Sequence, residues 1–218
     1  QQCLIDFDIP LYLSHTVSNV IGKSRLEKVV LSKVDDKMNL IPGSEIEIEC
    51  DTLILSVGLI PYTKQLISMG AIFAPGNKIV VDQNLQTSLP GIFSCGNCLH
   101  VHDVVDFVTQ EGREAGHAAS LYIKEKLQDN NMVNILAKDG VLYTIPQKIS
   151  TNLDEDVCFK FRVRKPIKDV FVVFRSNGQE IYKVFKQALV PSEMVMLNIS
   201  KDKLHNLTDD LEISLEGK

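Results

Sequence analysis

Residues 88–108, SLPGIFSCGNCLHVHDVVDFV, place two cysteines and two histidines within eight residues around a Gly-Asn pair. Three interpretations compete for this stretch: a metal site, a redox-active dithiol, and a cofactor-binding turn in which the cysteines are incidental. Each interpretation predicts a different fold around the stretch and a different chemistry. The choice among them therefore decides what kind of protein the sequence encodes.

The metal interpretation uses the pattern C-x2-C-x-H-x-H, formed by Cys95, Cys98, His100 and His102. Cysteine and histidine are ligands that zinc accepts, but structural zinc sites usually take two ligand pairs from separate segments. Four donors within eight consecutive residues would need an unusually tight loop to surround an ion. A metal site that uses Cys95 and Cys98 is thus the weaker interpretation, and it stays as an alternative.

The redox interpretation rests on Cys95-Gly96-Asn97-Cys98, a C-x-x-C pattern. The first cysteine of a reactive C-x-x-C pair normally lies at a helix N-terminus, where the helix field lowers the thiol pKa. Here Cys95 ends a predicted strand, several residues before the next predicted helix. This position does not suit a thioredoxin-like dithiol, and it leaves open a loop dithiol beside a flavin.

The cofactor interpretation rests on residues 87–97, TSLPGIFSCGN, followed by a long helical pattern. This stretch resembles the second flavin-binding motif of the FAD- and NAD(P)-dependent oxidoreductases related to thioredoxin reductase and the pyridine nucleotide-disulphide reductases. Residues 51–63, DTLILSVGLIPYT, resemble the same family's strand-Gly-x-x-Pro segment, where the chain leaves the nicotinamide domain for the flavin domain. The two motifs occur in the family's order, and the resemblance covers roughly residues 5–127.

The resemblance implies FAD and NAD(P) as cofactors and hydride transfer between nicotinamide and flavin. It assigns Gly96 and Asn97 to the ribityl–phosphate arm of the flavin. The pyrimidine edge of the ring would face the backbone N–H groups of three residues, Val105, Asp106 and Phe107. Catalytic residues are not identified; His100 and His102 are candidates as proton donors or substrate contacts, with a role in shaping the loop as the alternative.

Two departures from the family pattern narrow the expected activity. Asn97 stands where the common motif has Asp, so its side chain can bond a hydroxyl but carries no charge. No disulfide motif of the reductase kind is visible beside the flavin motif. The sequence after Asn97 resembles flavin dehydrogenases associated with anaerobic glycerol-3-phosphate dehydrogenase more than it resembles disulfide reductases.

The twelve glycines never form G-x-G-x-x-G, so neither dinucleotide fingerprint of the family is present. We therefore expect the chain to be the C-terminal fragment of a longer enzyme, with the upstream part of the same polypeptide as its partner. The parent protein would be an FAD-dependent oxidoreductase. The chain alone would carry one wall of the flavin site and would be inactive.

The predicted fold class is α/β, a partial flavoprotein with two dinucleotide-binding domains, followed by a small all-β sandwich. Residues 1–57 would end the nicotinamide-binding domain, 58–128 would form the C-terminal part of the FAD-binding domain, and 135–218 an immunoglobulin-like sandwich. A polar break at 128–131 would link the last two. The expected strands are 9–17, 26–34, 45–50, 52–57, 78–82, 91–95, 157–163, 170–174, 180–186, 193–199 and 211–216; the expected helices are 64–69 and 104–127.

Several side chains have simpler predicted roles in this fold. Asp103 would cap the N-terminus of the long helix. Lys160, Arg162 and Arg164 would form a basic stripe on a solvated sheet face.

Composition limits the partners. The net charge of −5 gives no reason to expect nucleic acid, and no uncharged run is long enough to span a membrane. Five cysteines, an odd number, suit a reducing cytoplasm better than a disulfide framework. The β-sandwich shows no chemistry of its own, so we expect it to serve a homo-oligomer or an electron-transfer partner. The alternative function is a non-catalytic subunit or docking module that uses this sandwich for assembly.

Overall fold

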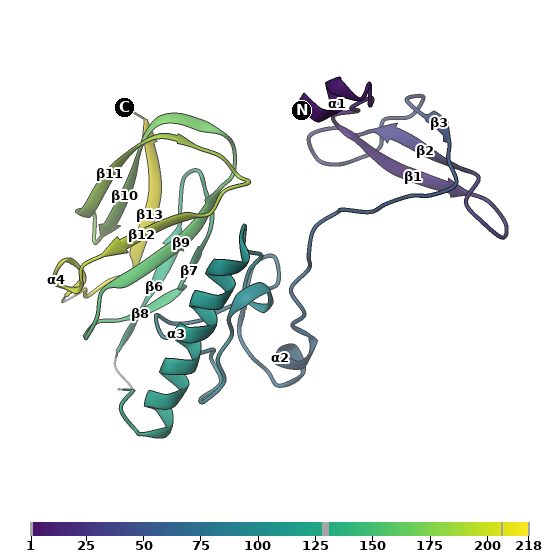
Figure 1. The fold of residues 1–218 in the computed structure, drawn as a ribbon. Helices are drawn as coiled ribbons and strands as arrows, with labels where there is room; N and C mark the ends of the chain where they lie inside the picture. The colour runs from purple at the N-terminus through teal and green to yellow at the C-terminus, as the bar shows by residue number, and fades with distance from the viewer. Residues whose placement is uncertain (1, 128–130, 206, 218) are drawn as a thin grey trace. The chain divides into compact units, whose positions relative to one another are not determined.

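The computed structural model describes residues 2–127, 131–205 and 207–217. The chain divides into two compact units, residues 1–58 and 59–218 (Figure 1). Within the described ranges, no helix is long and apolar enough to cross a membrane. The predicted domain boundaries stay predictions, and the predicted linker at 128–131 lies, apart from Asn131, outside the described residues.

The first unit is a three-stranded antiparallel sheet in the order β1-β2-β3, preceded by a short helix. Its central strand carries the buried side chains Val29, Val30 and Ser32, and the hydroxyl of Ser32 pairs with that of Ser18 at 2.6 Å. The predicted strands at 26–34 and 45–50 are confirmed. The elements are α1 (Gln2–Asp6), β1 (His15–Ile21), β2 (Lys28–Lys33) and β3 (Ile46–Glu49).

Two strand predictions in this unit are wrong. Residues 9–14 are not a strand, because Pro10 lacks a backbone donor and Ser14 takes a left-handed φ of 56° that breaks the extended chain; β1 begins only at His15. Residues 52–57 form neither helix nor strand, and Ile54 and Val57 are 86% and 87% exposed. No described strand pairs with this segment, so an apolar run that would suit a buried strand lies in solvent here.

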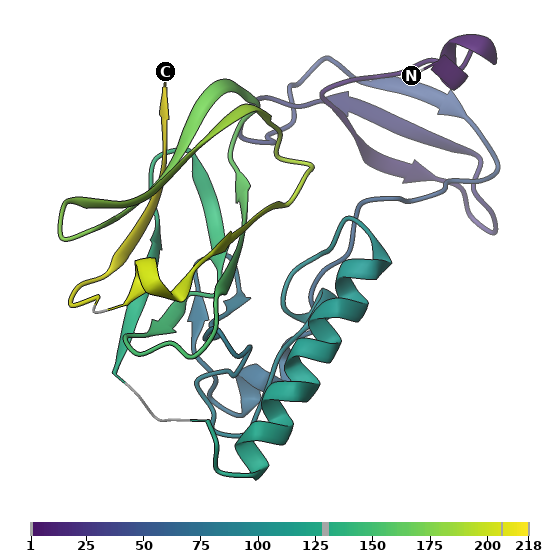
Figure 2. The ribbon, with the colours of Figure 1, turned by 60° about the vertical axis from the view of Figure 1, so that its left-hand side comes forward.

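The second unit begins with short elements and one long helix that share a small core. Buried Ile79, Val81, Leu85 and Leu99 pack together with Ala115 of the helix. Figure 1 shows this helix, α3, beside strands β7 and β9. In Figure 2 the helix begins at its upper end, where the preceding loop joins it. The elements are α2 (Lys64–Ser68), β4 (Phe73–Ala74), β5 (Lys78–Ile79), a 3₁₀ turn at Gly96–Cys98 and α3 (Val105–Ile123).

The predictions for this region are partly correct. The helix predicted at 64–69 is confirmed as α2, and the chain turns at Gly70 with φ 82°. The long helix is confirmed but ends at Ile123, because Glu125 takes a left-handed φ of 55°. The strand predicted at 91–95 is wrong: only one isolated bridge, Gln86 to Phe93, forms there. The strand predicted at 78–82 shrinks to β5.

The rest of the second unit is a set of strands in two sheets. One has five strands in the order β11-β10-β13-β6-β8, and the other has three in the order β12-β9-β7. The strands are β6 (Met132–Ala137), β7 (Val141–Ile145), β8 (Lys148–Ser150), β9 (Val157–Val163), β10 (Ile167–Ser176), β11 (Gln179–Leu189), β12 (Val195–Ile199) and β13 (Leu211–Gly217), with the short helix α4 (Lys201–Leu204) between the last two.

Both sheets contribute to one hydrophobic core. Phe159 and Phe161 of β9 and Phe174 of β10 are fully buried in it. Each such side chain contributes roughly 1.5–3 kcal/mol relative to an exposed one. Asn177 and Gly178, both with positive φ, form the hairpin turn between β10 and β11, a conformation that an Asn-Gly pair favours. The five strands predicted between 157 and 216 are confirmed, whereas β6, β7 and β8 were not predicted.

Strand β7 joins the two cores of the second unit. Its Val141 belongs to the large core, and its Ile145 belongs to the small core beneath α3. Gln147 strengthens the junction, because its side-chain oxygen accepts from Val81 N at 2.9 Å and its own N–H donates to Val81 O at 3.0 Å. Within residues 59–218, the helical half and the strand half are therefore one packed body.

Candidate functional site

The glycine of the predicted flavin motif lies in a tight turn with a left-handed backbone. Cys95 is extended, and Gly96 then takes a left-handed φ of 61° to begin the 3₁₀ turn. A Cβ on Gly96 would lie 3.2 Å from Val108 Cγ1 of α3. Glycine avoids both the steric cost of positive φ and this contact, so the loop can approach the helix closely.

A buried carboxylate from α3 holds this turn. The side chain of Glu111 has no exposed surface, and it accepts hydrogen bonds from four donors. Oε2 accepts from Gly96 N at 2.6 Å and His102 Nε2 at 2.9 Å. Oε1 accepts from His100 Nε2 at 3.1 Å and Lys160 Nζ at 2.8 Å. An ionised carboxylate offers about four acceptor positions, and here all of them are used.

The charges of this group support each other. Burial alone would raise the pKa of Glu111, but the hydrogen bond from His100 and the charge of Lys160 lower that pKa to about 2. Burial likewise opposes the charge on Lys160, and the carboxylates of Glu111 and Glu114 raise its pKa. Glu111 and Lys160 therefore form an ionised pair at neutral pH.

The two histidines stay close to this pair. Their rings lie 4.2 Å apart between centroids. Burial lowers the pKa of His100 despite the neighbouring carboxylate of Glu111. Because an ionised carboxylate can only accept, His100 carries its proton on Nε2. Its Nδ1 is buried and finds no hydrogen-bond partner among the described residues.

His100, His102 and Glu111 also have the ligand types and proximity of a metal site, with ligand atoms within 4.8 Å of one another. If the two histidines bound a metal ion through Nε2, Glu111 would lose two of its four donors but would still accept from Gly96 N and Lys160 Nζ. The ion would also meet the ammonium of Lys160, which lies 2.8 Å from Oε1. The arrangement therefore fits a closed ion pair better than a cation site.

The cysteines do not join this group. Cys98 is exposed, and its thiol donates to Tyr62 O at 3.9 Å. Burial, followed by the negative charge of Glu111, raises the pKa of the Cys95 thiol. A raised pKa disfavours the thiolate that both zinc binding and dithiol exchange require. In the described part of the chain, the predicted C-x2-C-x-H-x-H ligands are therefore not assembled around one point.

The prediction that Asp103 caps the long helix is wrong. The N-cap residue is Val104, and no side chain caps the helix there. Asp103 instead forms an ion pair with Arg162 of β9 and accepts from Met194 N at 2.7 Å. Arg162 also donates to Val101 O at 3.1 Å. A charged partner on β9 competes successfully with the local cap.

The predicted solvated basic stripe is also wrong for two of its three members. Lys160 is 4% exposed, and Arg162 is bound to the loop before α3. Strand alternation explains this: Phe159 and Phe161 face the large core, so the alternate side chains Lys160 and Arg162 face the loop and α3. This face of β9 is covered by protein and not by solvent. Arg164 is exposed as predicted.

The first turn of α3 contains the three predicted ring-edge residues, Val105, Asp106 and Phe107. The first N–H groups of a helix have no acceptor within the helix, and no side-chain cap occupies these. Val105 is 73% exposed. Asn97 is exposed too, and its Oδ1 accepts from His102 N at 3.1 Å. The start of the helix thus lies at an open surface next to the exposed Asn97, whereas the amides of Gly96, Leu99 and His100 are bonded within the protein.

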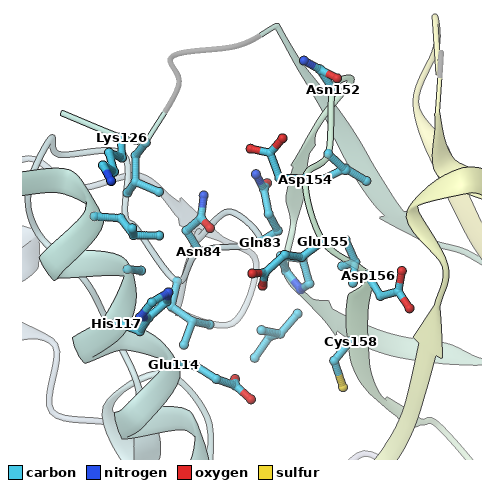
Figure 3. A pocket seen from close by; sticks show the side chains of 18 of the residues that line it. Gln83, Asn84, Glu114, His117, Lys126, Asn152, Asp154, Glu155, Asp156 and Cys158 are labelled. Carbon is cyan, nitrogen blue, oxygen red and sulfur yellow. The ribbon is translucent and has the colours of Figure 1, made fainter. Parts of the chain in front are cut away.

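A separate cavity of about 300 Å³ lies between α3 and the segment before β9. Figure 3 shows Glu114 and His117 on the helix side and Asp154, Glu155 and Asp156 on the opposite segment. None of the predicted flavin contacts lines this cavity. It is distinct from the Gly96 loop, although Lys160 reaches its edge.

Comparison with known proteins identifies the family. The model of the family described as pyridine nucleotide-disulphide oxidoreductase matches residues 1–144, about two thirds of the chain. The chain belongs to this family. The resemblance inferred from the two sequence motifs is thereby confirmed, and the match extends beyond α3 into β7.

Several curated proteins are similar to this member of the family. A thioredoxin reductase of Listeria innocua is 32% identical over 122 residues, which are 55% of this chain and 36% of that protein. A mercuric reductase of Shewanella putrefaciens is 28% identical over 114 residues, 50% of this chain and 19% of that protein. An NADH oxidase of Streptococcus pneumoniae is 29% identical over 100 residues, which are 46% of this chain and 19% of that protein. The chain thus matches only a minor part of each relative's length.

Among solved structures, a FAD-dependent pyridine nucleotide-disulphide oxidoreductase from Desulfovibrio vulgaris is similar to the chain at 17% identity. The match covers 81% of this chain and 41% of that one, with a TM-score of 0.42. A similarity of this size carries no argument about function.

In this member of the family, the site brings together four of the predicted residues and two that sequence reasoning missed. Gly96, Asn97, His100 and His102 lie in one loop. The two missed residues, Glu111 and Lys160, hold that loop from α3 and from β9. A signal for Glu111 was present: it lies three residues after Val108 and four before Ala115, on the face of the helix that packs inward.

Proposed function

We propose that this chain forms one wall of the flavin site of an FAD-dependent, NAD(P)-linked oxidoreductase that passes hydride between nicotinamide and flavin. Membership of the pyridine nucleotide-disulphide oxidoreductase family supports the chemistry. The observation that carries the proposal is the turn at Gly96, whose left-handed backbone stands next to the uncapped N-terminus of α3.

The residues present fit the cofactor. A Cβ on Gly96 would lie 3.2 Å from Val108 Cγ1, so glycine lets the loop that carries the exposed Asn97 pack closely against α3. FAD, when bound, supplies the group that accepts and returns hydride. The Gly96–Asn97 turn would hold its ribityl–phosphate arm. The N–H groups of Val105, Asp106 and Phe107 would bind the pyrimidine edge of the ring, where the positive end of the helix favours negative charge.

The histidines have a supporting role in this proposal. The Nε2 hydrogens of His100 and His102 are directed at Glu111, so neither is aimed at a substrate through that atom. The rings fill the space behind the Gly96 turn and complete the shell of donors around the carboxylate. Of the two roles that the sequence left open, shaping the loop is the one that we propose.

The remaining parts of the site come from elsewhere. The chain carries no glycine-rich dinucleotide fingerprint, so we propose that the upstream part of the same polypeptide provides it. We propose further that strands β6 to β13 form a small β-sandwich that serves assembly, either of a homo-oligomer or with an electron-transfer partner. Lys160 and Arg162 tie this sandwich to the cofactor loop.

The test is an absorbance spectrum of the complete product of the gene, purified beside residues 1–218 alone under the same conditions. We expect flavin bands in the complete product that NADH or NADPH bleaches without oxygen, and weak or absent bands in the chain alone. A complete product that is colourless, and stays so after incubation with FAD, would contradict the proposal and favour an assembly module.

A further inference from the structure

The group around Glu111 connects three separate parts of the second unit. Glu111 comes from the middle of α3, Gly96 from the loop before the helix, and Lys160 from β9. Lys160 lies between two core phenylalanines of the same strand, so its side chain points away from the large core and toward α3. A strand that the cofactor motif does not include thus reaches the carboxylate that holds the motif's glycine.

The ammonium of Lys160 has a clear physical effect on the Gly96 turn. Without a cation, a buried carboxylate is driven to take up a proton. A protonated Glu111 would lose part of its acceptor capacity and would have to release one of its four donors. The bond from Gly96 N, at 2.6 Å, depends on the ionised form, because bonds to a charged acceptor are the short and strong ones.

We infer that Lys160 is a positioning residue for the cofactor loop, acting through Glu111 on the backbone of Gly96. This inference rests on the proposed function, since it concerns the same flavin-binding turn. It gives the strand half of the unit a direct role at that turn, in addition to assembly. Glu114, the other carboxylate near Lys160 at 3.4 Å, is partly exposed, and among the described residues it bonds to Lys160 and Gln110 but not to the loop, so Glu111 is the route.

The experiment measures hydrogen exchange of the Gly96 amide by NMR in the 218-residue chain. The first variant is Lys160→Met, which keeps the length of the side chain and removes its charge. Exchange of the Gly96 amide should become about tenfold faster relative to core amides of β9 and β10, because its bond to Glu111 opens locally. The core amides report global unfolding, so the ratio of the two rates isolates the local opening. Lys160→Arg keeps the charge and should restore most of the protection.

The matched control is Lys138→Met. Lys138 also pairs with a glutamate, Glu212 at 3.2 Å, but both side chains are 45% exposed. Its loss should leave the Gly96 exchange rate unchanged. If Lys160→Met leaves the ratio of Gly96 exchange to core exchange as in the wild type, or if Lys138→Met raises it equally, the inference is overturned.

A second variant covers the case in which Lys160→Met does not fold. The double variant Glu111→Leu with Lys160→Met removes both charges together, so no unpaired charge is buried. It should fold, and its Gly96 amide should lose protection; retained protection overturns the inference. FAD plays no part in these measurements, so a chain whose Gly96 depends on Lys160 but whose gene product binds no flavin would refute the proposed function alone.

Discussion

Lys160 Nζ of β9 and Glu111 Oε1 of α3 lie 2.8 Å apart, and both side chains are almost completely removed from solvent. The residues are far apart in the sequence, one in the region that resembles a flavoprotein and the other in the strand-rich region. A second link, between Arg162 of β9 and Asp103 before α3, runs beside the first. The strand half is therefore part of the support for the loop that contains Gly96.

Replacing Glu111 with Gln should destabilise the chain strongly. The substitution leaves Lys160 charged, buried and without its main partner, and breaking a buried pair in this way costs about 3–5 kcal/mol. Urea unfolding of the wild type and the variant measures the difference. Glu114→Gln is the matched control: Glu114 is 39% exposed and 3.4 Å from Lys160, so its loss should cost less than about 1 kcal/mol. Equal effects of the two variants would contradict this account.

The stability supplied by Glu111 should depend on pH in the acid range. The pKa of Glu111 is about 2 in the folded chain against an ordinary value of 4.5. Between these two pH values the carboxyl group is protonated in the unfolded chain and ionised in the native chain. The contribution is thus complete above pH 4.5 and disappears as pH falls toward 2; the shift corresponds to roughly 3 kcal/mol.

This pH dependence is measured as the difference in unfolding free energy between the wild type and the variant with Glu111→Leu and Lys160→Met. The difference should shrink steadily between pH 4.5 and the acid unfolding limit. A difference that is independent of pH below 4.5 would show that Glu111 is not held ionised by its neighbours.

Gly96→Ala should lower the stability of the chain, whereas Gly112→Ala should not. Alanine at Gly96 must adopt a left-handed φ and approach Val108, a combination that costs roughly 1–3 kcal/mol. Gly112 lies in α3 with open space around it, and alanine there should stabilise the helix by up to about 1 kcal/mol. Thermal unfolding compares the two, and flavin retention by the complete gene product should fall only for Gly96→Ala. A silent Gly96→Ala would remove the main support for the proposed function.

The elements that could be predicted were those with a strong local signal. The Asn177-Gly178 turn and the alternation of Phe159 and Phe161 define a hairpin and a buried strand by themselves. Residues 52–57 were mispredicted because an apolar run becomes a strand only when another strand pairs with it. Whether a partner strand is present depends on the whole fold and cannot be predicted from the apolar run alone.

The candidate site was predictable on one side only. The loop residues follow from a motif, but Glu111 and Lys160 are charged side chains of types that are rarely buried, and only the helical position of Glu111 indicated burial. Each is buried because the other is present, and their separation in the sequence hides that dependence. Asp103 shows the same limit, since its position before a helix favours a cap while Arg162 offers a stronger bond.

The two cysteines of the opening stretch should behave as ordinary and unequal thiols. Cys98 is exposed, whereas Cys95 is partly buried with a raised pKa, so an alkylating reagent at pH 7.5 should modify Cys98 well before Cys95. Peptide mass spectrometry after timed alkylation gives both rates, and Cys98→Ser should leave flavin binding and bleaching of the complete gene product unchanged. Zinc that copurifies with the chain and is lost in Cys98→Ser would revive the metal interpretation. A fast Cys95, or electron transfer abolished by Cys98→Ser, would instead make the pair a redox centre beside the flavin.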